Sequence, residues 1–194
     1  MICREKIRYH KNLKNALENA VHPKEPENHL LQPTSVIALI YFKKESHLIF
    51  IQKADIKGYP WRNQIAFPGG HSDLKDTNRQ ETAIRELREE MGISDKDLDV
   101  VGSLGHFQTI NNKGIQAFLG IWNKKQEILY DTREISKIFY IPVNYLIKVH
   151  KKKNFKNRIP DIYELTYPYK DIVIWGVTAK ITHHFIEIIR NLSI

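Results

Sequence analysis

Three glutamates, Glu86, Glu89 and Glu90, stand at a spacing that places them on one side of a helix. At about 100° per residue, positions i, i+3 and i+4 share an arc of roughly 100° on the helix surface. Glu86 and Glu90 are then a like-charge pair, which destabilises an isolated helix by about 0.2–0.5 kcal/mol. We therefore expect a positive species between these carboxylates. Carboxylate oxygens are ligands for hard cations, so this pattern favours Mg²⁺ or Mn²⁺.

A pair of glycines, Gly69 and Gly70, follows Pro68 and precedes the segment that carries the glutamates. Glycine lets the backbone approach a ligand closely, and proline fixes the entry to a turn. Two glycines are a weak signal alone and a strong one near a helix that carries three carboxylates. We expect them to approach a metal or a phosphate, and His71 beside them to contact a phosphate.

A helix over residues 78–91 is the element that must position the glutamates. Thr77 and Gln80 have the spacing of a capping box at its start, and Gly92 is placed to end it. One apolar stripe of this helix is expected to face the core; it consists of Ala83, Ile84, Leu87 and Met91. The carboxylates lie beside that stripe, at the edge of the core.

Runs rich in valine, isoleucine and phenylalanine lie on both sides of this helix in the sequence. We expect strands over 35–42, 47–52, 64–67, 98–104, 115–122 and 138–141, and a strand pair over 163–167 and 171–175. Further helices are expected over 13–21, 143–149 and 177–192. Strands on both sides of a central helix predict a sheet with helices on both faces. Trp175 and Gly176, between the last strand and the last helix, are expected to serve the structure.

The composition indicates one globular domain of 194 residues, 42% of them hydrophobic. A single cysteine, Cys3, excludes an intramolecular disulfide framework and fits a reducing compartment. The longest apolar run, Val36–Phe42, is too short for a signal peptide or a membrane span, so we expect a cytoplasmic protein. The net charge of +8 favours anionic partners.

The chain resembles a known family, the Nudix hydrolases. Their signature box is a glycine followed by Arg-Glu-apolar-x-Glu-Glu-x-Gly-apolar, and Gly70 with Arg85–Ile93 (Arg-Glu-Leu-Arg-Glu-Glu-Met-Gly-Ile) is similar to it. The family usually has a further Glu eight residues before the Arg, where this chain has Thr77, with Asp76 one position earlier. The loop from Gly70 to Arg85 is thus one residue longer than the general pattern.

That longer loop resembles the coenzyme A pyrophosphatase branch of the family. The segments Gln64–Gly70, Glu134–Pro142 and Ile174–Ala179 also look like segments of this branch. Where the branch has an Arg and then a Gly before the Gln, this chain has Tyr59 and Asn63. The similarity runs from about residue 35 to the end of the chain, so residues 1–34 are expected as a lead-in and 35–194 as the Nudix domain.

The resemblance implies an α/β fold, namely an α/β/α sandwich whose mixed central sheet has helices on both faces. It implies metal-dependent hydrolysis of a diphosphate bond in a nucleoside-diphosphate-linked substrate. In this branch that substrate is coenzyme A or a derivative, giving 3′,5′-ADP and 4′-phosphopantetheine. Glu86, Glu89 and Glu90 would bind Mg²⁺ or Mn²⁺, with the Gly70 carbonyl as an additional ligand. Arg85 would hold the glutamates in position.

Several assignments stay open at this point. The general base is either a glutamate of the box or Glu134. Tyr59 and Trp61 are candidates to stack on a nucleobase, and packing in the core or a loop is the alternative. The expected partner is a small nucleotide, and a homodimer is expected because dimers are common in the family.

Other substrates are alternatives to coenzyme A: ADP-ribose, NADH, a dinucleotide or capped RNA. A non-catalytic protein of Nudix fold that binds nucleic acid is a further alternative. Such a protein would bind nucleic acid through a basic segment that consists of Lys148, Lys151, Lys152, Lys153, Lys156 and Arg158. The alternative interpretation of this segment is a solvated loop that binds no ligand.

Overall fold

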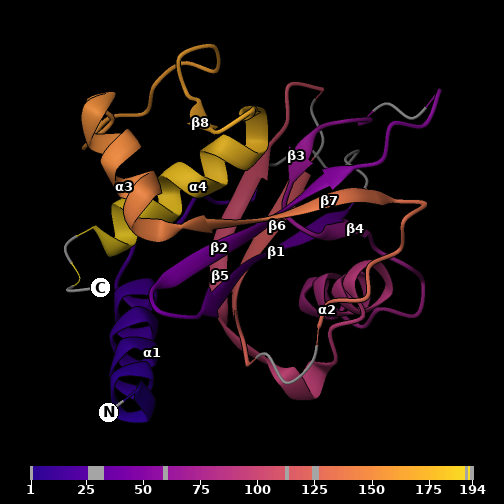
Figure 1. Ribbon diagram of the computed structural model, residues 1–194, viewed down its shortest axis with the longest axis horizontal. Helices are drawn as coiled ribbons and strands as arrows, with labels where there is room; N and C mark the ends of the chain where they lie inside the picture. The colour runs from indigo at the N-terminus through magenta and orange to yellow at the C-terminus, as the bar shows by residue number, and fades with distance from the viewer. Residues whose placement is uncertain are drawn as a thin grey trace.

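A seven-stranded mixed sheet forms the centre of the computed structural model, which describes residues 2–25, 33–58, 61–111, 114–123, 127–190 and 192 (Figure 1). The strands are β1 (Thr34–Phe42), β2 (Ser46–Lys53), β3 (Ile65–Ala66), β4 (Gly69–His71), β5 (Leu98–Gln108), β6 (Gly114–Trp122) and β7 (Ile135–Pro142). Their order is β3-β2-β1-β6-β5, with β4 paired to β1 and β7 paired to β2. The β1–β6 pair is parallel and the other pairs are antiparallel, so the sheet is mixed as expected.

The central strands are apolar on both faces because both faces are covered. Successive side chains of a strand point to opposite sides. In β1, Ala38 and Ile40 belong to a core shared with α1 (Ile2–Glu18), α3 (Val143–Lys152) and α4 (Gly176–Ile189). Ile37 and Leu39 belong to a second core shared with α2 (Arg79–Met91). The predicted sandwich is therefore confirmed, and Figure 1 shows α2 apart from the other helices.

The second sheet is a hairpin of β8 (Tyr167–Tyr169) and β9 (Ile172–Ile174). The strand predicted over 163–167 begins only at Tyr167, because the Asp161 carboxylate accepts the backbone N–H groups of Tyr163 and Glu164 at 2.8 and 3.0 Å. These bonds form a local turn that competes with an extended strand. The hairpin leads directly into α4, and β9 lies against β3.

The remaining elements differ from the sequence expectations mainly at their ends. The first helix begins at Ile2 and not near residue 13, and it buries Leu13 and Leu17 against the sheet. Gly69–His71, expected as part of a loop, forms β4 because it pairs with the start of β1, with Ser35 opposite Gly70. A short 3-10 helix, η1 (Asp95–Asp97), connects α2 to β5.

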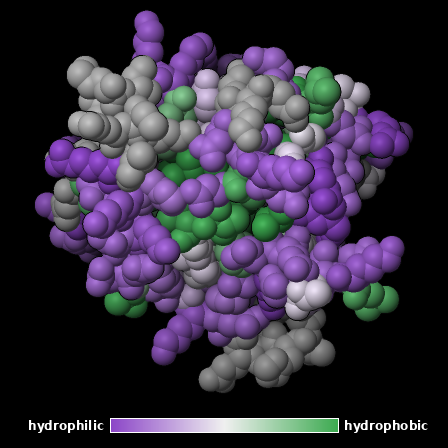
Figure 2. All heavy atoms as spheres, turned by 90° about the horizontal axis from the view of Figure 1, so that it is seen from below, coloured by the Kyte–Doolittle hydropathy of each residue, from purple (hydrophilic) through white to green (hydrophobic). Residues whose placement is uncertain are grey.

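The face of the molecule seen from below is mainly polar (Figure 2). On the face shown in Figure 2, hydrophilic side chains surround one central area where hydrophobic side chains gather. Among the described residues, no helix combines the length and the apolar character that crossing a membrane requires.

Candidate functional site

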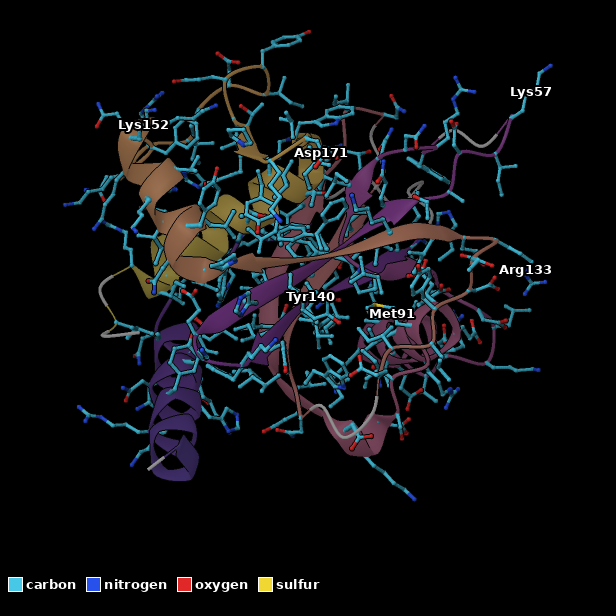
Figure 3. All side chains as sticks on the ribbon, in the orientation of Figure 1. Lys57, Met91, Arg133, Tyr140, Lys152 and Asp171 are labelled. Carbon is cyan, nitrogen blue, oxygen red and sulfur yellow. The ribbon has the colours of Figure 1, made fainter. Side chains whose placement is uncertain are left out.

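Helix α2 holds the three glutamates at the edge of the core because its adjacent apolar side is fixed there. Ala83, Leu87 and Met91 are fully buried between the helix and the sheet, where Figure 3 shows Met91. The helix ends at Gly92, whose left-handed φ of 66° suits glycine and whose N–H donates to the Arg88 carbonyl at 2.9 Å.

The predicted capping box is shifted by one residue. Asn78, and not Thr77, caps the helix, because its side-chain oxygen accepts the Glu81 N–H at 3.0 Å. Glu81 in turn accepts both the backbone N–H and the hydroxyl of Thr77, at 2.8 and 2.7 Å. One bond of a capping box thus joins Glu81 to the cap residue Asn78, and the return bond of Glu81 goes to Thr77, the residue before the cap.

Arg85 holds several groups of the site in place through hydrogen bonds. Its Nε and Nη2 donate to the two oxygens of Asp76, each at 3.0 Å, in a bidentate pair. Its Nη1 donates to Glu86 at 2.8 Å and to Glu89 at 2.9 Å, and its Nη2 also reaches the carbonyl of His71 at 2.9 Å. One guanidinium therefore fixes two glutamates of α2 relative to β4.

Asp76 is a site residue that the sequence reasoning did not select. The Arg85 guanidinium holds the pKa of Asp76 well below its usual range, so the carboxyl group stays ionised. Thr82 and the backbone N–H of Asp73 also donate to it, at 2.9 and 2.8 Å. The signal was the box spacing: Asp76 stands one residue before the position of the family's usual Glu, and in the longer loop it takes up the pairing with the arginine.

Glu90 lies deepest, with 2% of its side chain exposed. One oxygen accepts a hydrogen bond from Lys53 at the end of β2, and the other accepts the Gly69 N–H at 3.0 Å. Burial raises the pKa of Glu90, and the charge and the hydrogen bond of Lys53 act in the opposite direction. Lys53 is 8% exposed, and nothing in its sequence context marked it as part of the site.

Glu86 fills the space beside Gly70. A Cβ atom at position 70 would lie 2.5 Å from the Cδ and Oε2 atoms of Glu86, so only glycine leaves this carboxylate in place. Burial also raises the pKa of Glu86, and Arg85 opposes this shift. Glu89 is more open, with 56% of its side chain exposed.

The donor set suits a hard divalent cation. Lys53 and Arg85 already stand beside the three carboxylates, and within the described parts of the chain no three Asp, Glu, His or Cys side chains converge enough to enclose a metal ion by themselves. Glu86 and Glu90 nevertheless offer oxygens to one cavity, and burial disfavours the charged form of both. A cation would relieve this cost, so the residues fit the ion that their spacing predicts.

A cavity of about 730 Å³ joins most of the predicted site residues, a volume typical of small-molecule sites. It is lined by Gly69, Gly70, His71, Trp61, Glu86, Glu90 and Glu134. Arg85 and Glu89 are not among its lining residues; they support the wall that Glu86 forms. Tyr59 lies outside the described residues.

Three further details bear on the predictions. Asn63 has a left-handed φ of 59°, a region that asparagine tolerates better than most residues. His71 Nδ1 lies 2.8 Å from the Thr34 hydroxyl, which orients the ring beside Trp61. Trp175 is 44% exposed and lines the cavity, so the purely structural role expected for it does not account for its position.

The basic segment lies elsewhere. Its six side chains come from α3 and the turn after it, and none is among the described residues that line the cavity. Figure 3 shows Lys152 at the end of α3, pointing away from the molecule. Arg158 forms an ion pair with Glu164.

Comparison with known proteins gives a match to the NUDIX domain over residues 31–164. The uncharacterized Nudix hydrolase NudL of Photorhabdus laumondii is 25% identical over 167 residues, covering 85% of this chain and 88% of that protein. The mouse peroxisomal coenzyme A diphosphatase NUDT7 is 26% identical over 144 residues. That match covers 70% of this chain and 60% of the mouse protein.

Solved structures agree on the fold. A MutT/nudix family protein from Enterococcus faecalis aligns with a TM-score of 0.58 at 14% identity, covering 98% of this chain and 70% of that one. An Ap4A hydrolase from C. elegans aligns with a TM-score of 0.50 at 17% identity, covering 62% of this chain and 87% of that one.

Proposed function

Because the chain belongs to the Nudix family and is a hydrolase that acts on a diphosphate bond, we propose that its substrate is coenzyme A or a derivative. The products would be 3′,5′-ADP and 4′-phosphopantetheine. The mouse coenzyme A diphosphatase among its relatives supports this substrate, as does the Asp76–Arg85 pair in the longer loop. The observation that carries the proposal is the cavity in which the buried Glu90 and the partly buried Glu86 meet a glycine backbone.

Glu86, Glu89 and Glu90 would hold a divalent cation, Mg²⁺ or Mn²⁺, with the Gly70 carbonyl as a further oxygen donor. When bound, the ion offsets the negative charge that develops on the phosphoryl group under attack. The protein contributes rigidity to this site. Arg85 fixes Glu86 and Glu89, while Lys53 and the Gly69 N–H fix Glu90.

A general base must remove a proton from the attacking water. Glu134 is exposed and lines the cavity, and Glu86 and Glu90 of α2 line it too, so both sources are candidates. The variant Glu134→Gln separates them. If Glu134 is the base, this variant should lower the rate about 10²-fold or more, which is within the range typical of general base catalysis. Nearly full activity would assign the base to α2.

The remaining lining residues would contact the substrate outside the reacting bond. His71 and the glycine pair stand beside the carboxylates, where they can meet phosphate oxygens. Trp61 offers a half-buried aromatic face for a nucleobase. Because the basic segment does not line this cavity, binding of nucleic acid is not part of the proposal.

The test is turnover of a panel that contains coenzyme A, ADP-ribose, NADH, a dinucleoside polyphosphate and capped RNA, with Mg²⁺ or Mn²⁺. Glu90→Gln should lower the rate about 10²–10³-fold, equivalent to roughly 3–4 kcal/mol of transition-state stabilisation. Its single amide oxygen can accept from Lys53 or from the Gly69 N–H but not from both, so the fold of the variant is checked by its melting temperature. Glu81→Gln, the same change on the same helix away from the cavity, is the matched control and should keep full activity.

Cleavage of coenzyme A that disappears in Glu90→Gln supports the proposal. Preference for another member of the panel would contradict the assignment of coenzyme A as the substrate but would agree with the assignment of the site. Full activity of Glu90→Gln on its best substrate would contradict the assignment of the site itself.

A further inference from the structure

Helix α4 begins at the cavity without a cap. Its first three residues, Gly176, Val177 and Thr178, all line the cavity, and the residue before them, Trp175, makes no capping hydrogen bond through its side chain. The first hydrogen bond within the helix runs from the Ala179 N–H to the Trp175 carbonyl at 3.3 Å. The N–H groups before it have no partner within the helix, and they carry the positive end of its dipole.

The Thr178 side chain is a second, independent feature of this place. It is 7% exposed and lines the cavity, and among the described residues its hydroxyl has no hydrogen-bond partner. The threonine one turn later differs, because the Thr182 hydroxyl donates to the Thr178 carbonyl at 2.8 Å. A threonine that lines the cavity and has no partner in the protein can donate its hydroxyl hydrogen to a ligand, so the site is suited to a ligand that supplies an acceptor.

The space in front of the helix is open. A Cβ atom at Gly176 would meet nothing within 4 Å, although its φ of 62° favours glycine. Trp175 adds an aromatic side chain that is 44% exposed at the same edge. A ligand can therefore reach the free N–H groups.

The start of α4 and the glutamates hold different walls of one cavity. Helix α2 packs on one face of the sheet and α4 on the other, so the carboxylates and the helix N-terminus approach the cavity from opposite sides. Apolar side chains also line the cavity, including Ile115 and Ile181. A ligand that satisfies both ends carries two separate anionic groups joined by a less polar body.

We propose that the N-terminus of α4, through the Thr178 hydroxyl and the N–H groups of residues 176–178, binds a phosphate that the nucleoside of the substrate carries in addition to the cleaved diphosphate. This inference rests on the proposed function and narrows the substrate class to nucleotides with such an extra phosphate. The glutamates and their cation would bind the diphosphate, and the N-terminus of α4 would favour substrates that carry the additional phosphate. Thr178 is thereby assigned as a specificity residue.

The test uses binding, so that it does not depend on turnover. Adenosine 3′,5′-bisphosphate and adenosine 5′-monophosphate are titrated calorimetrically into the full chain, without divalent metal and with EDTA. The wild type should bind the bisphosphate at least tenfold more tightly than the monophosphate. Thr178→Val should reduce this ratio about tenfold, the size expected for one hydrogen bond to a charged group. Thr182→Val removes a buried hydroxyl that does not face the cavity, and it should leave the ratio unchanged.

A second pair of variants tests the charge at the helix N-terminus. Val177→Asp places a carboxylate beside the free N–H groups, which favours the helix but repels a phosphate. Val177→Asn has nearly the same shape without the charge. The Asp variant should bind the bisphosphate at least tenfold more weakly than the Asn variant, with similar affinities for the monophosphate.

Three results would overturn the proposal: equal affinity of the wild type for both nucleotides, an equal loss for both in Thr178→Val, or equal behaviour of the two Val177 variants. Failure of the proposed function is a separate result. It appears as absence of coenzyme A cleavage in the presence of metal, whatever the calorimetric ratio.

Discussion

The buried pair of Lys53 and Glu90 offers the most direct test of how the site is held together. The two side chains are 10% and 2% exposed and come from β2 and α2. The variant Lys53→Met removes the cation and leaves the carboxylate in place. Breaking a buried pair in this way typically costs about 3–5 kcal/mol, because the remaining charge is left without compensation.

The structure points to the lower end of that range. Glu90 keeps the hydrogen bond from the Gly69 N–H, and its raised pKa lets it take up a proton more readily than an exposed glutamate. We expect Lys53→Met to lower the free energy of unfolding by about 3 kcal/mol. With an m value of about 2 kcal/mol/M, the urea midpoint would fall by about 1.5 M.

Two further variants isolate the cause. The double variant Lys53→Met with Glu90→Gln removes both charges and should recover most of the loss, leaving a cost of about 1 kcal/mol. Lys137→Met makes the same substitution at an exposed pair with Asp171 and should cost less than about 0.5 kcal/mol. A loss in Lys53→Met no larger than in Lys137→Met, or no recovery in the double variant, would refute the reasoning.

Three other predictions concern the glycines, a partly buried histidine and the cation. Gly70→Ala should displace the flexible end of Glu86, which lowers activity at least tenfold but changes stability little. Gly69→Ala, whose Cβ would lie 2.2 Å from a backbone oxygen of β1, should lower the free energy of unfolding by about 3 kcal/mol. The reverse ranking of the two variants in melting and turnover assays would contradict both expectations. Burial lowers the pKa of His184 to about 4, so unfolding takes up a proton between about pH 6.5 and 4, and stability should fall by about 2 kcal/mol from pH 7.5 to 4.5 in urea titrations. The variant His184→Gln should lose this part of the pH dependence, and an unchanged slope would exclude His184 as its source. Mg²⁺ at ten times its Kd should stabilise the fold by about 1.4 kcal/mol, measured as a rise in melting temperature that matched ionic strength of NaCl does not reproduce.

Local patterns in the sequence were sufficient for the helix that carries the glutamates. Its apolar stripe and the glycine after it depend on residues within a few positions of each other, so α2 was predicted to within a residue. Its cap was misplaced by one residue, because Thr77 and Asn78 are both good caps and only the observed bonds separate them. The runs rich in valine, isoleucine and phenylalanine likewise predicted the strands β1 and β2.

Only the tertiary structure determined which residues from distant parts of the chain contact the glutamates. Lys53 lies 37 residues before Glu90, and Gly69 lies 21 residues before it, so no local pattern could pair them. Their contact exists because β2 and β4 are both bound to β1, against which α2 packs. In the same way the hairpin of β8 and β9 brings Trp175 to the cavity. Sequence spacing determined which groups share a helix face, and the sheet pairing determined which charges those groups meet.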